Sequence, residues 1–231
     1  MGAARVVVTG AAGALGRVVA RRFIDGGHPV VLVDLDEAAL RRAHGDAPAS
    51  ARFVAVDLTD TAAATAAIAG ALAREPAGVL CNLAGGFAMG HPVHDADGGD
   101  WQKMIDLNVS TLLGASRAVV PGMIAAGRGR IVNVAAASAT SGKASMGAYV
   151  AAKSAVARLT ESMALELRGH GIGVNAIAPS IIDTPANRAA MPDADPAAWV
   201  TPAQLADVIG FLASDAASAI HGAVIPVVGL S

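Results

Sequence analysis

The sequence predicts an α/β fold with a single doubly wound parallel sheet and helices on both of its faces. Short runs of β-branched residues alternate with longer alanine-rich segments of helical spacing along the whole chain. The length of 231 residues fits one α/β domain, and no linker, composition break or repeat divides it. Hydrophobic residues make up 54% of the chain, as expected where strands are buried on both faces. We therefore expect one domain over residues 1–231.

Seven stretches have the length and composition of buried strands, and the segments between them are long enough to be crossover helices. We expect helices over 101–126 and 148–168, and helix starts near Glu37, Thr59 and Thr201. Ligands of such sheets bind beyond the carboxyl ends of the strands, so functional residues should follow the strands. The expected strands are Arg5–Thr9, Pro29–Asp34, Arg52–Asp57, Gly78–Asn82, Arg130–Val134, Gly173–Ile177 and Ala223–Val228.

The first expected strand runs into a glycine turn, TGAAGALG at residues 9–16, and an amphipathic helix follows. Glycines let the backbone approach a phosphate closely, and the start of the helix offers unpaired N–H groups and the positive end of its dipole. This order of elements is typical of a Rossmann-type turn that binds a dinucleotide pyrophosphate. The expected cofactor-binding residues of this turn are Gly10, Ala12, Gly13, Leu15 and Gly16.

Carboxylates end the second and third strands. Asp34 is placed to accept hydrogen bonds from an adenosine ribose and to repel a 2′-phosphate, which predicts NAD, with NADH preferred and NADP possible. The alternative for Asp34 is a cap on the helix near Glu37. Asp57 either meets the adenine edge beside Leu58 or caps the helix near Thr59.

Later strand ends complete the expected cofactor site. Asn82, Ala84 and Gly85 follow the fourth strand, where small residues suit a close approach of the cofactor. Pro179 and Ile182 follow the sixth strand and begin an irregular, proline-rich stretch over about 179–199, which we expect to cover the substrate as a lid.

The chemistry is indicated by Tyr149 and Lys153, which lie at positions i and i+4 and so share one face of a helix. An ammonium beside a phenol favours the phenolate and lowers the phenol's pKa, which provides a proton donor and acceptor near neutral pH. With a nucleotide-binding turn in the same chain, the pair predicts hydride transfer to or from a C=O or C=N bond. Both residues are therefore also expected near the cofactor.

The order of these motifs resembles the short-chain dehydrogenase/reductase family over nearly the whole chain. The resemblance rests on residues 9–16, on NLAG at 82–85, on Asn108 and on the YxxxK pattern of Tyr149 and Lys153. It implies that Tyr149 is the general acid/base and that Lys153 lowers its pKa and binds the nicotinamide ribose. Asn108 would hold a water that relays protons from Lys153, although a buried structural hydrogen bond is the alternative for this residue.

The sequence departs from that family in two places. The family's substrate-binding serine corresponds to Ala136, and Ser138 is the nearest replacement; the middle glycine of the turn comes one residue early at Gly13. A subgroup typified by dihydropteridine reductase, which reduces a quinonoid pterin with NADH, also lacks this serine. The C-terminal segments DTPANR at 183–188, MPDAD at 191–195 and Trp199 are similar to that enzyme.

Three functions follow. The first is an NAD(P)-dependent short-chain oxidoreductase acting on a carbonyl or imine carbon of a small molecule, with Tyr149 as acid/base. The alternatives are a dihydropteridine reductase-like reduction of a quinonoid pterin and a catalytically silent protein that senses NAD(H). Retention of Tyr149, Lys153 and Asn108 favours an enzyme over the silent protein.

Composition bears on partners and location. The net charge of −2 without a basic cluster argues against nucleic acid, and the best membrane candidate, 62–73, is too short to span. The single cysteine, Cys81, forms no internal disulfide and reads as buried, which with the absence of an expected leader points to the cytoplasm. His91 and His94 lack further ligands, so no metal is expected. Apolar helices over 101–126 and 148–168, the first capped by Asp100, predict a homodimer or homotetramer.

Overall fold

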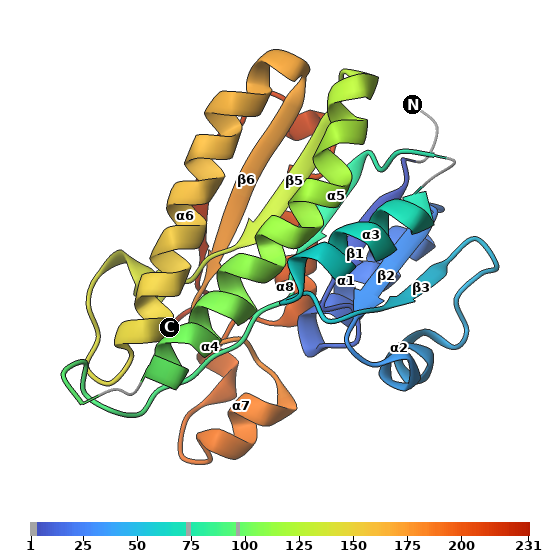
Figure 1. The fold of residues 1–231 in the computed structure, drawn as a ribbon. Helices are drawn as coiled ribbons and strands as arrows, with labels where there is room; N and C mark the ends of the chain where they lie inside the picture. The colour runs from blue at the N-terminus through green and yellow to red at the C-terminus, as the bar shows by residue number, and fades with distance from the viewer. Residues whose placement is uncertain (1–3, 73–74, 96–97) are drawn as a thin grey trace.

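The computed structural model describes residues 4–72, 75–95 and 98–231, and its strands form one seven-stranded sheet in the order β3-β2-β1-β4-β5-β6-β7 (Figure 1). All the paired strands run parallel, and each of the seven predicted strands is present. The strands are β1 (Val6–Thr9), β2 (Val30–Asp34), β3 (Arg52–Ala55), β4 (Val79–Asn82), β5 (Gly129–Val134), β6 (Ile172–Pro179) and β7 (Val224–Val227).

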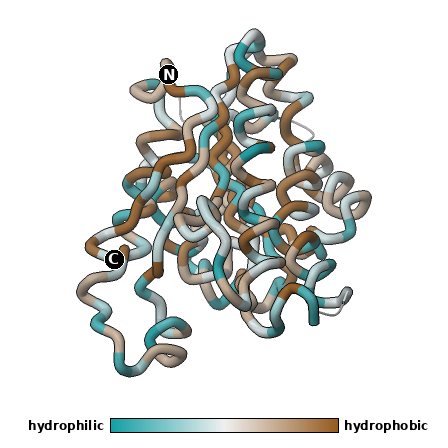
Figure 2. The backbone as a smooth tube through the Cα atoms, turned by 90° about the vertical axis from the view of Figure 1, so that its left-hand side faces the viewer, coloured by the Kyte–Doolittle hydropathy of each residue, from teal (hydrophilic) through white to brown (hydrophobic). Residues whose placement is uncertain are grey.

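The centre of the sheet explains the high apolar content of the chain. In β1, Val7 is in register with Val31 of β2 on one side and with Leu80 of β4 on the other, and none of the three is exposed. β-Branched side chains suit strands buried on both faces, because their restricted rotamers pack well on a pleated surface. The hydrophobic segments accordingly run through the middle of the molecule in Figure 2.

Helices cover both faces of the sheet, which confirms the predicted doubly wound fold (Figure 1). On one face, α1 and α8 pack against each other and share a buried cluster with Leu40 of α2. On the other face, α3 packs on α5, and α6 lies along β6. The helices are α1 (Ala14–Asp25), α2 (Glu37–His44), α3 (Thr61–Leu72), α4 (Gly98–Ile105), α5 (Thr111–Ala126), α6 (Gly147–Leu167), α7 (Pro185–Ala190) and α8 (Pro202–Leu212).

The helix caps settle two alternatives from the sequence. Helix α2 is capped by Asp36, whose carboxylate accepts the Ala38 N–H at 2.8 Å, so the idea that Asp34 caps it is wrong. Helix α3 begins at Thr61, two residues later than expected, and Asp60 accepts the N–H groups of its first turn. Asp57 therefore does not cap α3 either. Short side chains of Asp cap helices in this way because they reach the N–H groups two or three residues ahead.

The helix expected over 101–126 is longer and is interrupted. It starts at Gly98 as α4, passes through a π-helical turn at Asp106–Ser110 and continues as α5 to Ala126. Asp100 thus lies inside the first turn instead of capping the helix as expected.

Among the described residues, the helical stretch Gly98–Ala126 is long and apolar enough to cross a membrane, since an 18-residue window within it has a mean hydropathy of 1.4. The stretch 62–73 was therefore the wrong candidate. Length and composition are weak indicators, because a core helix of a soluble protein meets the same criteria, and 39% of the apolar window is buried here.

The stretch over 179–199 is more regular than the sequence suggested. It contains α7, which Thr184 caps by accepting the Asn187 N–H at 3.2 Å, and a short 3₁₀ turn at Pro196–Ala198. A parallel bridge joins Ile182 to Val200 and closes the segment on itself. Because it directly follows β6, the segment projects from the carboxyl ends of the strands, at the lower end of Figure 1.

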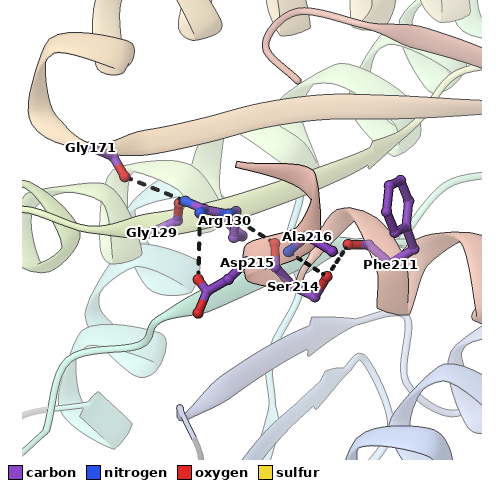
Figure 3. Close-up of polar contacts among 7 residues, drawn as sticks. All are labelled: Gly129, Arg130, Gly171, Phe211, Ser214, Asp215 and Ala216. Carbon is purple, nitrogen blue, oxygen red and sulfur yellow. Dashed lines mark hydrogen bonds and ion pairs between the residues drawn. The ribbon is translucent and has the colours of Figure 1, made fainter. Parts of the chain in front are cut away.

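The opposite end of the sheet is fastened by Arg130 at the start of β5 (Figure 3). Its guanidinium donates to the carbonyl of Ser214 at 3.3 Å and to that of Gly171 at 3.5 Å, and it pairs with Asp215 at 3.6 Å. These contacts tie β5 to the start of β6 and to the end of α8. This end of the sheet is thereby held together, while the carboxyl ends of the strands remain available for ligands.

Candidate active site

The glycine turn between β1 and α1 is packed too tightly for side chains at two of its positions. Gly10 has φ +64°, and a Cβ there would lie 2.9 Å from the Ala84 Cα. A Cβ on Gly16 would lie 2.0 Å from the Gly10 carbonyl oxygen. The turn can therefore press against both the loop after β4 and the first turn of α1 only because these residues are glycines.

The start of α1 has no side-chain cap, as is also true of α6, whose N-cap is Met146. The N-cap of α1 is Gly13, and the first turn carries no acidic residue, whereas Asp36, Thr184 and Thr201 cap α2, α7 and α8. The first N–H groups of a helix need partners, and together with the dipole they favour an anion. The uncapped glycine turn therefore fits the pyrophosphate of a dinucleotide.

Asp34 at the end of β2 is aimed at this turn. One carboxylate oxygen, Oδ2, accepts the Ala12 N–H at 2.9 Å, and the other, Oδ1, accepts the N–H of Leu35 at 2.8 Å. The residue is half-buried, while the Leu35 side chain is 68% exposed. A carboxylate thus lies beside the glycine turn, where it would repel a second phosphate and accept hydrogen bonds from hydroxyl groups.

Asp57 and Leu58 lie after β3 in different environments. Asp57 is exposed, and the hydroxyl and N–H of Thr59 both donate to its Oδ1, at 2.7 and 2.8 Å, which lowers the pKa of Asp57. Leu58 is only 6% exposed and packs in the core. The adenine-edge role of Asp57 stays a prediction.

The loop after β4 is held by Thr9, which was not among the predicted site residues. The hydroxyl of Thr9, the last residue of β1, accepts the N–H groups of Leu83 and Ala84 at 3.0 and 3.1 Å. The sequence contains one indication of this role, which is that Thr9 comes immediately before Gly10 of the glycine turn. Asn82 itself is buried and donates to Asn133 Oδ1 at 2.9 Å, so its side chain links β4 to β5.

Asn108 lies in the π-helical turn, a feature often found at functional sites. Its amide nitrogen donates to the carbonyls of Met104 and Gly86 at 3.0 and 3.1 Å, and its Oδ1 accepts the Gly86 N–H at 3.2 Å. These bonds match the structural alternative for Asn108. A Cβ on Gly85 would lie 2.8 Å from Asn108 Oδ1 and 3.4 Å from Lys153 Nζ. The two side chains therefore meet at Gly85, and the relay role stays a prediction.

Lys153 and Tyr149 lie on α6, as expected from their spacing. Lys153 is 6% exposed, and its ammonium donates to the Val134 carbonyl at 2.8 Å. Burial lowers the pKa of Lys153 to about 8 and raises the pKa of Tyr149 to about 12. The pKa of Tyr149 thus lies above its usual range and not below it as expected, because burial of the phenol disfavours the phenolate. That Lys153 lowers this pKa stays a prediction.

The ring of Tyr149 contacts an aromatic residue to which no sequence motif pointed. Phe87, in the loop after β4, meets the Tyr149 ring edge to face, with centroids 4.9 Å apart and planes at 78°. Phe87 is nevertheless 60% exposed. An exposed aromatic ring therefore stands directly beside the candidate acid/base.

The segment after β5 places Ala136 and Ser138 close to α6. Ala136 is 5% exposed and lies two residues beyond Val134, whose carbonyl accepts the Lys153 ammonium. Ser138 is half-buried in a 3₁₀ turn that is tied to α6 by the bond from the Ser154 hydroxyl to the Ala139 carbonyl, 2.9 Å long. A methyl group thus occupies the position where the resemblance implies a hydroxyl.

The last two predicted cofactor-binding residues lie at and after the end of β6. Pro179 is the last residue of β6, and the carbonyl of Ile182 accepts a hydrogen bond from the Asn187 side chain of α7 at 2.8 Å.

Cys81 is fully buried, and burial raises the pKa of its thiol to about 12, so it remains a thiol. In the part of the chain that the structure describes, no group of three or more metal-binding side chains occurs.

Comparisons with known proteins agree with this geometry. A family model described as short chain dehydrogenase matches residues 4–195. The chain is 37% identical over 234 residues to the cis-4-hydroxycyclohexanecarboxylate dehydrogenase of Sinomonas cyclohexanicum. The aligned region covers 96% of this chain and 94% of that protein. It is 36% identical over 226 residues to the inactive 2-(S)-hydroxypropyl-CoM dehydrogenase 2 of Xanthobacter autotrophicus, with 91% and 98% covered.

A solved structure has a similar fold. The structure of a gluconate 5-dehydrogenase from Burkholderia cenocepacia J2315, in complex with NADP and tartrate, aligns with 98% of this chain and with 94% of the dehydrogenase chain. The TM-score is 0.89 at 28% sequence identity.

Proposed function

This chain belongs to the short-chain dehydrogenase family of NAD(P)-dependent oxidoreductases, and from that premise we propose that it transfers hydride between nicotinamide and a carbonyl or imine carbon. Tyr149 is the general acid and base of the proposed reaction. One observation carries the proposal: the side chains of Lys153 and Asn108 meet at Gly85, in the loop that packs against the glycine turn. Lys153 lies four residues after Tyr149 on α6.

The protein's own residues have distinct proposed roles. A bound nicotinamide supplies or accepts the hydride. The uncapped start of α1 binds the pyrophosphate, and Lys153 binds the nicotinamide ribose. With a pKa raised to about 12, the Tyr149 phenol is protonated at neutral pH, which suits it to give a proton to the oxygen or nitrogen of a substrate being reduced. The remaining nominated residues complete the cofactor cleft: Gly10, Ala12, Gly13, Leu15, Gly16, Asp34, Asp57, Leu58, Asn82, Ala84, Gly85, Pro179 and Ile182.

The direct test is NADH oxidation by the purified protein with a panel of acceptors. The panel contains an aliphatic ketone, an ortho-quinone and a quinonoid dihydropterin. In the opposite direction, reduction of NAD is followed with a cyclic hydroxy acid as the hydride donor. Turnover of any acceptor supports the oxidoreductase, and preference for the pterin supports the dihydropteridine reductase-like alternative. NADH binding without turnover of any acceptor supports the silent, NAD(H)-sensing alternative, which the name of the inactive Xanthobacter relative keeps in view.

The finer proposal is a substrate that is planar and conjugated. Ala136 offers no hydroxyl to a developing oxyanion, so a substrate that spreads charge over its own π system suits the site better. Phe87 adds an exposed ring at Tyr149 on which a planar acceptor stacks. The backbone next to that ring is anchored, because Gly86 bonds to Asn108 through both its N–H and its carbonyl.

We expect Ala136→Ser to raise kcat/KM for an aliphatic ketone by about 10- to 100-fold, because the new hydroxyl donates to the developing oxyanion. The rate with a conjugated acceptor should change much less, since that substrate needs the donor less. Steady-state kinetics with both acceptors measures the ratio of kcat/KM for the ketone to kcat/KM for the conjugated acceptor.

Ser138→Ala is the control for this comparison. If Ser138→Ala alone abolishes ketone reduction, Ser138 already supplies the donor. If the unmodified protein reduces simple ketones efficiently and neither variant alters the ratio, the proposed preference for conjugated acceptors is wrong.

We expect the protein to prefer NADH over NADPH, because the Asp34 carboxylate lies beside the glycine turn and repels a 2′-phosphate. Asp34→Ser removes the charge and should narrow the ratio of NADPH to NADH dissociation constants by about tenfold or more. Fluorescence titration with each cofactor measures both constants. Asp36→Ser, a change of the same charge in the cap of α2, is the control and should leave the ratio unchanged. Tighter binding of NADPH by the unmodified protein would contradict the placement of Asp34.

We also propose a homodimer or homotetramer in the cytoplasm, without membrane or nucleic-acid partners. Three large apolar side chains are exposed on α4, α5 and α6: Trp101, Ile124 and Leu165, at 50%, 39% and 63%. Such side chains are common in subunit interfaces. Light scattering of the purified protein gives the assembly size.

A further inference from the structure

One peptide group of the glycine turn is held at both ends by side chains from the β2–α2 unit. The Ala11–Ala12 peptide presents its carbonyl oxygen to His44 Nε2, 2.9 Å away, and its N–H to Asp34 Oδ2, also 2.9 Å away. A carbonyl oxygen only accepts, so His44 Nε2 carries the hydrogen. His44 is the last residue of α2 and is 3% exposed.

The two hydrogen bonds matter because this peptide lies just before the start of α1. It directly precedes Gly13, the residue that begins α1 without a side-chain cap. Its neighbours are glycines on both sides, Gly10 and Gly13, whose backbones have more conformational freedom than those of other residues. Rotation of the Ala11–Ala12 peptide would redirect the N–H groups at the start of α1.

We propose that His44 is a positioning residue for cofactor binding: it fixes the orientation of the Ala11–Ala12 peptide and thereby holds the glycine turn ready for the pyrophosphate. The inference rests on the proposed binding of NAD(H) at this turn. Asp34 also holds the peptide, but its carboxylate is proposed to accept hydrogen bonds from the ribose when cofactor binds. His44 lies behind the turn on α2 and keeps its bond in both states.

The test compares His44→Phe with His44→Gln. Phenylalanine fills the buried space but leaves the Ala11 carbonyl without a donor, whereas the glutamine amide reaches about as far as Nε2 and can still donate. We expect His44→Phe to weaken NADH binding by about three- to tenfold and His44→Gln to restore most of it. For wild-type and variant proteins, fluorescence titration gives the dissociation constant, and kinetics should show a raised KM for NADH with little change in kcat.

His28 supplies a matched control. Its Nδ1 bonds to the Ala4 carbonyl at 2.8 Å, and it packs on Phe23, away from the glycine turn. His28→Phe should lower the melting temperature without changing the NADH dissociation constant. If His44→Phe is too large to fold, His44→Leu removes the same donor with a smaller side chain.

A second readout needs no cofactor. Hydrogen exchange of the peptide that covers residues 10–16 should be faster in His44→Phe than in wild type, and unchanged in His28→Phe and His44→Gln. Exchange and NADH affinity both equal to wild type in His44→Phe and His44→Leu would overturn the role of His44. Failure of the wild-type protein to bind NADH would instead overturn the proposed function, while the exchange data would still report on the turn.

Discussion

Tyr149→Phe should lower kcat/KM by about 10²–10⁴-fold while leaving NADH binding nearly unchanged. The ring of phenylalanine retains the edge-to-face contact with Phe87, whose centroid lies 4.9 Å away, so the site keeps its shape. What is lost is the proton that the phenol gives to the substrate. Steady-state kinetics with the best acceptor, together with NADH titration of the same variant, separates chemistry from binding.

The pH dependence provides an independent check of the same residue. Because the pKa of Tyr149 is raised to about 12, the phenol is protonated at neutral pH, and reduction should vary little between about pH 6 and pH 7, where Lys153 with its pKa of about 8 also stays protonated. Oxidation of an alcohol needs the phenolate, so its rate should rise with pH. Near-normal turnover of Tyr149→Phe would remove the proposed mechanism, and a flat profile for oxidation would assign the base to another group.

Gly16→Ala should abolish measurable NADH binding. The new methyl group would lie 2.0 Å from the Gly10 carbonyl oxygen, so the turn and the start of α1 must move apart. A backbone shift of this kind costs about 1–3 kcal/mol of stability or more, and it displaces the N–H groups proposed to bind the pyrophosphate. NADH titration and thermal unfolding of the variant measure the two effects.

Gly70→Ala is the matched control, because Gly70 lies inside α3 and a Cβ there meets nothing within 4 Å. Alanine in a helix interior is favoured over glycine by about 1 kcal/mol, so this variant should be slightly more stable and bind NADH as wild type does. Wild-type affinity in Gly16→Ala would show that the glycine turn does not hold the cofactor.

The sheet was predictable because its signals are local. Each of the seven strands is a short apolar run of contiguous residues, so it can be identified from the residues within it. The helix boundaries were less predictable: Asp60 and not Asp57 caps α3, and Gly98 and not Trp101 begins α4. Neighbouring aspartates compete for the same cap, and the choice depends on backbone geometry that the sequence does not display.

The candidate site divides in the same way. The glycine turn and the Tyr149–Lys153 spacing could be identified from the sequence, because a turn and one helix face are properties of contiguous residues. The direction of the Tyr149 pKa could not, since it depends on burial by side chains from distant segments, including Phe87.

The sequence by itself therefore determined the fold and the family, and it supplied the residues that we propose for hydride transfer. Tertiary structure alone decided which groups surround those residues: Asn108 and Lys153 meet at Gly85, and His44 reaches the Ala11 carbonyl from 33 positions away. The physical reason is that periodic patterns encode which face of an element is buried. Burial, desolvation and hydrogen-bond partners arise only when elements that are remote in the chain pack together.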